Sequence, residues 1–159
     1  MKKALFLICL LLFSFGTSFA QIDSTLLKEF EEKLQKEGDE VELELKYWTC
    51  CFGGDDCNNN ELIWSTLAKF LKAKDSIHIE IISHTDCRGD AAYNEALSNA
   101  RSEVFLKVLK RKDISQKRIT TAGYGGTKPK IACKCEACTD EEHEQNRRTA
   151  IRISKIDTI

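Results

Sequence analysis

The fold is decided by the stretch Ile77-His-Ile-Glu-Ile-Ile-Ser-His-Thr-Asp-Cys-Arg-Gly-Asp90. Its first half is rich in isoleucine and predicts a strand, and the polar residues that follow predict a short turn. Asp90 is a suitable N-cap for a helix that runs on through Asn94 to Arg101. The strand therefore leaves a carboxylate, Asp86, at its end and close to the start of a helix.

On both sides of this stretch the sequence alternates between helical and extended patterns. Apolar residues at helical spacing predict helices over residues 23–36, 61–73 and 90–112, and a capping box of Thr139 and Glu142 predicts a short helix that ends near residue 146. Extended patterns predict further strands over residues 41–48, 118–125 and 149–156. Because each long helix joins two strands, those strands should be parallel. We therefore expect an α+β fold, a two-layer βαβαβ(α)β sandwich with a mixed four-stranded sheet and helices on one face.

The first twenty residues have the pattern of a secretory signal peptide. Lys2 and Lys3 precede an apolar run, and Ser18-Phe19-Ala20 forms a small-x-small cleavage site. Cys9 lies inside the apolar run, directly after Ile8, so it does not match a lipid-attachment site. We expect a signal peptide at residues 1–20, an N-terminal helix or spacer at residues 21–39, and one domain at residues 40–159.

Charge and cysteine content limit what the exported part of the chain can do. It carries 22 basic and 25 acidic residues, a net charge of −3, so nucleic acid is not an expected partner. It also retains seven cysteines. An exported chain is expected to use most of its cysteines in disulfides. Because seven is odd, at least one is free, paired with another chain, or bound to something else.

Asp86, Asn94 and Arg101 form the candidate binding site. Asn94 and Arg101 are seven residues apart, which is two helical turns, so they share one helix face. Helical side chains lean toward the N-terminus, so Arg101 can reach back toward Asp86. Such a pair can clamp a small zwitterion, with Asp86 taking an ammonium and Arg101 a carboxylate. The alternative that spacing leaves open is a structural Asp86–Arg101 salt bridge that only fixes the turn.

Five motifs, in order along the chain, carry a resemblance to a known family. They are Ser83-His-Thr-Asp86-x-x-Gly89, Tyr93-Asn94-x-x-Leu97-Ser98-x-x-Arg101, Arg118-Ile-x-x-x-Gly-Tyr-Gly125, Lys128-Pro129 and Asn146-Arg147-Arg148. With these motifs, residues 40–156 resemble the OmpA-like C-terminal domain, the peptidoglycan-associated module also found in Pal and MotB. The resemblance implies an exported, non-catalytic protein that binds the peptidoglycan stem peptide non-covalently through diaminopimelate.

The resemblance also implies a role for individual residues. Asp86 and Arg101 would hold the diaminopimelate. The residues that would line the pocket around it are Thr85, Asn94 and Leu97. One arginine of the pair Arg147-Arg148 would close the pocket, and we favour Arg147.

Location and partners follow from the same resemblance. Members of this family usually tether their membrane to the cell wall. We expect neither a lipid anchor nor a further membrane-spanning segment in this chain. The protein would then be free in the periplasm, or associated with the outer membrane through another protein, such as an outer-membrane protein. Its main expected partner is peptidoglycan of the diaminopimelate type.

All seven cysteines lie in segments expected at the ligand-binding end of the sheet. They are Cys50, Cys51, Cys57, Cys87, Cys133, Cys135 and Cys138. The pair before Thr139 resembles a variant typical of Bacteroidetes relatives, in which a disulfide closes the loop before the Asn-Arg-Arg motif. We therefore expect Cys133 to pair with Cys138. A bridge from Cys51 or Cys57 to Cys87 is also geometrically allowed.

The alternative function is that of an exported metal-binding or thiol-redox protein. Cys133, Cys135 and Cys138 with His143 would suit a Cys₃His zinc site, although export favours disulfides. The spacing Cys135-x-x-Cys138 meets the usual redox motif only loosely. The three histidines, His78, His84 and His143, form no recognisable triad with a nucleophile. We expect no enzymatic activity, no cofactor and no resident metal.

Overall fold

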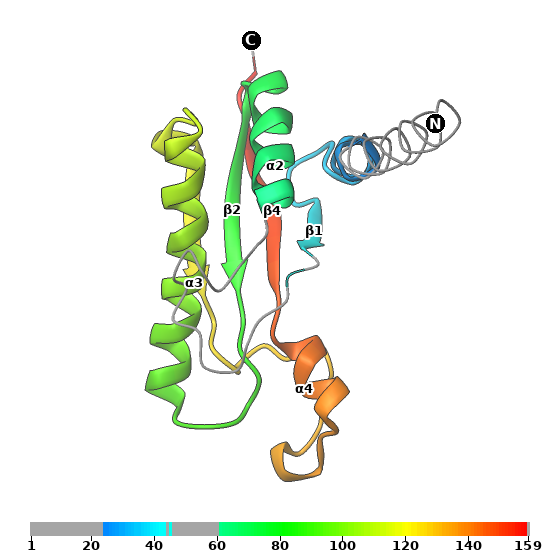
Figure 1. Ribbon diagram of the computed structural model, residues 1–159, viewed down its shortest axis with the longest axis vertical. Coiled ribbons are helices and arrows are strands. Elements are labelled where there is room, and N and C mark those ends of the chain that lie inside the picture. The colour runs from blue at the N-terminus through cyan, green and yellow to red at the C-terminus, as the bar shows by residue number, and fades with distance from the viewer. Residues whose placement is uncertain (1–23, 44, 46–60, 159) are drawn as a thin grey trace, which may run out of the picture.

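The centre of the fold is strand β2 (Ile77–Ser83), which comes from the organising stretch. A computed structural model describes residues 24–43, 45 and 61–158 (Figure 1). Three further strands complete one sheet: β1 (Glu40–Leu43), β3 (Ile119–Gly123) and β4 (Thr149–Ile156). The strand order is β1-β4-β2-β3, with β2 parallel to β3 and β4 antiparallel to both β1 and β2. The predicted mixed four-stranded sheet is confirmed.

The direction of the strands decides where a site can form. β1, β2 and β3 all point the same way, as predicted for strands joined by helices, and β4 runs the opposite way between β1 and β2. The carboxyl ends of three strands and the start of β4 therefore meet at one end of the sheet (Figure 1). Loops at such an end are where ligands bind in parallel sheets.

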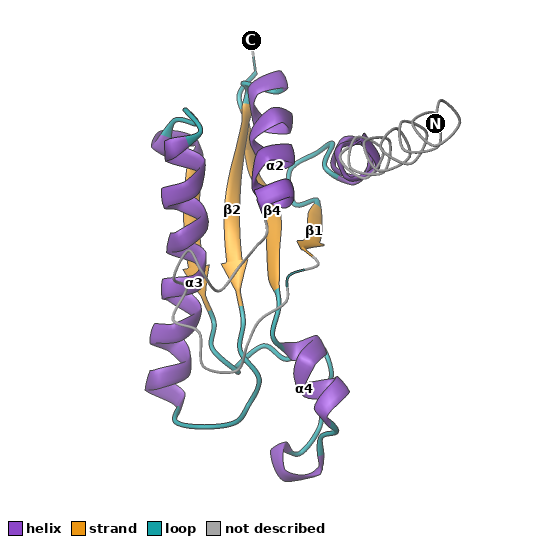
Figure 2. Ribbon diagram, in the orientation of Figure 1, coloured by secondary structure: helices purple, strands orange, loops and turns teal. Residues whose placement is uncertain are grey.

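Two long helices cover one face of the sheet (Figure 2). They are α2 (Glu61–Ala73) and α3 (Ala91–Arg111), and both start where the sequence predicted. Two edge-to-face ring pairs stabilise the core. Trp64 of α2 packs on Phe105 of α3, and Phe30 packs on Phe70 of α2, each with ring centroids 6.0 Å apart. Phe30 belongs to a helix over residues 24–33, so this N-terminal helix shares the core of the domain.

The opposite face of the sheet is polar. Glu80 of β2 and Arg152 of β4 sit opposite each other on it and form an ion pair at 2.5 Å. His78 lies on the same strand face and is bonded to Asp157 at 2.8 Å. A face with this composition needs no covering layer, so the domain has two layers, as the alternation of apolar and polar residues predicted.

Arg118 marks a difference from the predicted third strand. The strand was expected to begin at Arg118, but this residue ends a short 3-10 helix, η2 (Gln116–Arg118), and β3 begins at Ile119. Its guanidinium donates to the carbonyl oxygens of Leu71 and Lys74 at 3.0 and 2.7 Å. Leu71 is in the last turn of α2 and Lys74 directly follows the helix, so neither carbonyl has a partner within α2, and bonding to them fixes Arg118 ahead of the strand.

Some predictions fall outside the described residues. These are the signal peptide at residues 1–20, the end of the first strand, and the loop that contains Cys50, Cys51 and Cys57. The short helix α4 (Asp140–Asn146) is described and begins with the predicted capping box of Thr139 and Glu142. Among the described helices, none combines the length and the apolar character that crossing a membrane requires.

Candidate functional site

The turn after β2 is held in place by its neighbours. The backbone N–H of His84 donates to the carbonyl of Arg148 at 2.8 Å, and that of Thr85 donates to the carbonyl of Gly125 at 3.0 Å. Asp90 caps α3, because its carboxylate accepts the backbone N–H groups of Ala92 and Tyr93. The turn therefore joins β2 to α3 in a fixed geometry, with Asp86 between them.

Asp86 is the buried acid of this turn, at 5% exposure. Its Oδ2 accepts hydrogen bonds from Arg88 at 2.9 Å and from Arg147 at 2.6 Å, and its Oδ1 accepts the backbone N–H of Arg88 at 3.0 Å. Burial by itself would raise the pKa of Asp86, but the hydrogen bonds from the two arginines outweigh it and lower the pKa below its usual value. The carboxylate is therefore ionised at neutral pH.

All six residues predicted for the site line one cavity of about 240 Å³. They are Thr85, Asp86, Asn94, Leu97, Arg101 and Arg147. Arg101 extends from α3 into this cavity and is 2% exposed. The described ion pairs of Asp86 are with Arg88 and Arg147, so the predicted alternative of a structural Asp86–Arg101 salt bridge does not account for this turn.

Arg88 was missed at the level of sequence. Arg88 occupies an unspecified position of the turn motif, yet it gives Asp86 both a backbone and a side-chain hydrogen bond. Asn94 fixes this arrangement by donating from Nδ2 to the carbonyl of Arg88 at 2.9 Å. The sequence signal for Arg88 is its position, two residues after Asp86 and directly before Gly89. The positive φ of Gly89, 94°, turns the chain back toward α3.

The two adjacent arginines after α4 face different ways. Arg147 reaches the carboxylate of Asp86 and lines the cavity. Arg148 instead donates to the backbone carbonyl of Lys128 at 3.0 Å. Of the pair, Arg147 is thus the residue placed at the cavity.

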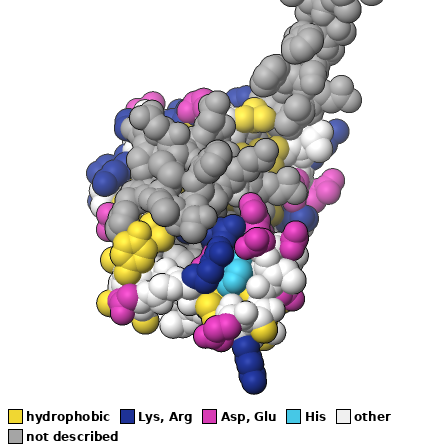
Figure 3. All heavy atoms as spheres, turned by 60° about the horizontal axis from the view of Figure 1, so that its bottom comes forward, with side chains coloured by type: hydrophobic (Ala, Val, Ile, Leu, Met, Phe, Trp, Pro, Cys, Tyr) yellow, Lys and Arg dark blue, Asp and Glu magenta, His cyan; other side chains and the backbone are white. Residues whose placement is uncertain are grey.

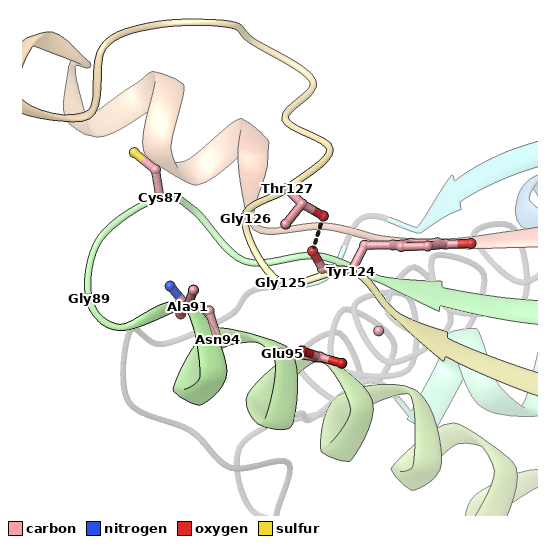
Figure 4. Close-up of a pocket in the computed structure, with 10 residues that line it drawn as sticks. Cys87, Gly89, Ala91, Asn94, Glu95, Tyr124, Gly125, Gly126 and Thr127 are labelled. Atoms are coloured by element: carbon pink, nitrogen blue, oxygen red, sulfur yellow. Dashed lines mark hydrogen bonds between the residues drawn. The ribbon is translucent and has the colours of Figure 1, made fainter.

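A second cavity of about 460 Å³ adjoins the first and shares Gly89 and Asn94 with it. Figure 4 shows one wall of this second cavity, the segment Gly123–Thr127, which lies opposite the first turns of α3. A side chain at Gly126 would bring its Cβ within 2.7 Å of the carbonyl oxygen of Asp86. Glycine at this position therefore lets the loop pack directly on the Asp86 turn.

Two disulfides brace the same end of the molecule. Cys133 is bonded to Cys138, as predicted, with their Cα atoms 5.5 Å apart. Cys87 is bonded to Cys135, with their Cα atoms 5.7 Å apart. This corrects the allowed bridge from Cys87 to Cys51 or Cys57. The reason is spatial, because the segment before α4 lies against the Asp86 turn and brings Cys135 within bonding distance.

His84 is buried beside the site and stacks on Tyr124, with ring centroids 5.6 Å apart. Burial, together with the positive charges of Arg148 and Lys128, lowers its pKa from 6.5 to about 4. The ring is therefore neutral at pH 7. Among the described residues its buried Nδ1 has no hydrogen-bond partner.

Acid should destabilise the fold through His84. Its pKa is lower in the folded than in the unfolded state, so its contribution is complete above pH 6.5 and is lost as the pH falls toward about 4. We expect a loss of about 1 to 2 kcal/mol after allowance for solvent screening. Urea unfolding above pH 6.5 and at about pH 4 measures this loss of unfolding free energy. His84→Phe keeps an aromatic ring without titration and should remove this part of the pH dependence. An equal pH dependence in both proteins would contradict the assignment.

Charged groups of both signs meet at this end of the molecule. Figure 3, which turns this end toward the viewer, shows basic and acidic side chains next to one another on its surface. Within the smaller cavity the balance is positive: Arg88, Arg101 and Arg147 surround the single acid Asp86. The described lining residues thus offer one anionic group and an excess of guanidinium groups.

Comparisons with known proteins identify relatives of this chain. A model of the OmpA family matches residues 58–147, which is more than half of the chain. The peptidoglycan-associated lipoprotein of Legionella pneumophila is 33% identical over 81 residues, which are 51% of this chain and 44% of that protein. The outer-membrane lipoprotein YfiB of Pseudomonas aeruginosa is 32% identical over 141 residues, which are 87% of this chain and 79% of that protein.

The extent of these matches differs between relatives and structures. The chain spans about half of the length, or less, of several curated relatives that it matches. Among solved structures, the cell wall anchor of the T6SS from Pseudomonas aeruginosa superposes with a TM-score of 0.61 at 20% identity. That match covers 84% of this chain and 96% of the other, and it shows a shared fold. With the family model and YfiB together, the chain belongs to the OmpA family.

Proposed function

We propose that this protein binds peptidoglycan non-covalently in the cell envelope, and that it helps to anchor the envelope to the cell wall without catalysing a reaction. The observation that carries the proposal is the smaller cavity, where an ionised Asp86 lies among three arginines. Relatives named as peptidoglycan-associated lipoproteins, and a solved structure named as a cell wall anchor, support it.

The ligand group that fits this cavity best is the free end of diaminopimelate. In a stem peptide that end carries an ammonium and a carboxylate on the same carbon atom. Oδ1 of Asp86 accepts one hydrogen bond from the described residues, the backbone N–H of Arg88, and so keeps a lone pair for the ammonium. Arg101 offers a planar guanidinium to the carboxylate, for which bidentate hydrogen bonding is favoured.

The excess positive charge supports a peptide ligand rather than an isolated zwitterion. A diaminopimelate end has no net charge, whereas three arginines and one acid line the cavity. Arg88 and Arg147 also pair with exposed acids outside the lining, Asp140 at 3.6 Å and Glu144 at 3.4 Å. Stem peptides carry further carboxylates next to the diaminopimelate, and these would meet the additional arginines. The adjoining cavity of about 460 Å³ gives room for the remainder of the peptide.

Co-sedimentation with purified peptidoglycan tests the proposal through Asp86→Asn. We expect binding to weaken by about 30-fold or more, because the variant removes the charged acceptor for the ammonium and the carboxylate that Arg88 and Arg147 share. Bound and free protein are quantified across a range of peptidoglycan concentrations.

Asp157→Asn is the matched control for this experiment. Asp157 is also an ion-paired aspartate, bonded to His78 at 2.8 Å, but it follows β4 at the opposite end of the sheet. It should sediment like the unchanged protein. If Asp86→Asn also did so while its circular dichroism showed a native fold, the site would be wrong. If the unchanged protein failed to sediment, the proposed function itself would be wrong.

A further inference from the structure

Four cysteines and one histidine gather beside the Asp86 turn, and the proposed function uses none of them. We call them the cysteine cluster: Cys87, Cys133, Cys135, Cys138 and His143. The Sγ atoms of Cys87 and Cys138 and a ring nitrogen of His143 all lie within 4.8 Å of one another. Nδ1 of His143 is 3.9 Å from Sγ of Cys87. Two disulfides account for the four cysteines, but they do not account for the buried imidazole of His143 beside them.

We propose that, once its two disulfides are reduced, the cysteine cluster binds one zinc ion through Cys87, Cys135, Cys138 and His143. A tetrahedral zinc ion holds two sulfur ligands about 3.8 Å apart and a sulfur and a nitrogen ligand about 3.6 Å apart. The distance of 3.9 Å between Cys87 and His143 is close to the second value. The distances from Cys138 to Cys87 and to His143, at most 4.8 Å, need to shorten by about 1 Å. Once reduced, the sulfur of Cys135 has to move away from that of Cys87 to reach the separation of two zinc ligands.

The choice of ligands follows from spacing and position. Cys135 and Cys138 have the C-x₂-C spacing typical of zinc sites, and Cys135 already touches Cys87 through their disulfide. His143 lies on α4, is 4% exposed, and is held by the helix that the capping box of Thr139 starts. Cys133 is left over, because its sulfur groups with Cys138 and Glu142 rather than with Cys87 and His143.

The surroundings allow a reductant and a metal ion to reach the cluster. An open cavity of about 490 Å³ is lined by Cys135, Cys138 and His143 together with Arg88 and Asp140. Sulfur and imidazole ligands together suit zinc better than magnesium or calcium, which prefer oxygen.

The chemistry balances with a dithiol as the reductant. Each disulfide accepts two electrons and two protons from one dithiol, which leaves as its own disulfide, so two dithiols yield four cysteine thiols. Zinc then displaces the thiol protons of Cys87, Cys135 and Cys138 and takes the lone pair of a ring nitrogen of His143. The oxidised protein has no thiolate in this cluster and should not take up zinc there.

Two single variants that break the same disulfide test the proposal. In a background of Cys50→Ser, Cys51→Ser and Cys57→Ser, the reduced protein is loaded with zinc without oxygen and desalted, and bound zinc is measured by elemental analysis. We expect about one zinc per chain in this background and in Cys133→Ser, but almost none in Cys138→Ser. The reason is that, of these two cysteines, Cys138 is a proposed ligand and Cys133 is not. Cobalt in place of zinc should give the intense visible absorption of tetrahedral thiolate sites with the same pattern.

Two histidine variants complete the test. His143→Gln retains all four cysteines of the cluster and should lose stoichiometric zinc, which decides the question if Cys138→Ser does not fold. His78→Gln, on the polar face of the sheet, is the matched control and should keep it. The proposal is overturned if the reduced background protein binds no zinc, or if Cys133→Ser and Cys138→Ser retain equal amounts. Zinc uptake by the oxidised protein would overturn the requirement for reduction.

Discussion

Replacing Cys87 and Cys135 together by alanine is expected to lower the free energy of unfolding by about 4 kcal/mol. The disulfide joins residues 48 positions apart, and closing a loop of that length removes much of the conformational freedom of the unfolded chain. The loss is a large fraction of the stability of a typical domain, about 5 to 15 kcal/mol. Urea unfolding without reductant measures it, and the double variant leaves neither partner of this disulfide as an unpaired thiol.

The second disulfide provides the matched comparison. Cys133 and Cys138 are only five positions apart, so the same reasoning predicts a loss of about 2 kcal/mol when both become alanine. The long bridge also ties the Asp86 turn to the segment before α4, whereas the short bridge closes a local loop. Equal losses for the two pairs, or a larger loss for the short one, would contradict a loop-length origin of the stabilisation.

Elements whose determinants are local could be predicted from sequence. The bounds of α2 agree with the prediction because its apolar residues repeat at helical spacing over its whole length. The start of α3 and the start of α4 agree because Asp90 and Thr139 cap them through contacts with residues two or three positions away. Such signals lie inside the element that they define, so no knowledge of the tertiary structure is needed.

The order of the strands could not be derived in the same way. β4 lies between β1 and β2, and it pairs with both through residues far away in the sequence, such as Ile151 opposite Val41 and Ile81. A strand pattern shows which face is apolar but not which neighbour a strand will have. The position of Arg118 also depends on distant groups, because the carbonyls to which it donates belong to the last turn of α2 and to the residue after it.

The site, too, could be predicted only in part from the sequence. The six predicted residues lie around one cavity, and the family resemblance rather than spacing identified Thr85, Leu97 and Arg147 among them. Seven cysteines leave many pairings open, and no local pattern selects Cys135 as the partner of Cys87. That pairing follows from how α4 and its preceding loop pack on the Asp86 turn, which is a property of the folded chain.

A stem peptide with lysine in place of diaminopimelate should bind about 100-fold more weakly. The two peptides share the side-chain ammonium that Asp86 would accept, but lysine lacks the carboxylate beside it. Arg101 is 2% exposed, so a ligand that fails to offer this carboxylate forfeits a charged hydrogen bond in a site shielded from water. Losing one partner of such a pair typically costs about 2 to 5 kcal/mol. Calorimetric titration of both soluble peptides measures the difference directly.

The variant Arg101→Lys shows whether Arg101 is the group that reads the carboxylate. Lysine keeps the positive charge but not the planar fork that bonds a carboxylate at two points. If Arg101 holds the diaminopimelate carboxylate, the variant should weaken the diaminopimelate peptide far more than the lysine peptide, so that the two affinities converge. A constant ratio between the peptides in both proteins would place the carboxylate at another arginine of the cavity, of which Arg147 is the nearest described to Asp86, at 2.6 Å. Equal binding of the two peptides by the unchanged protein would instead mean that Asp86 selects an ammonium group alone.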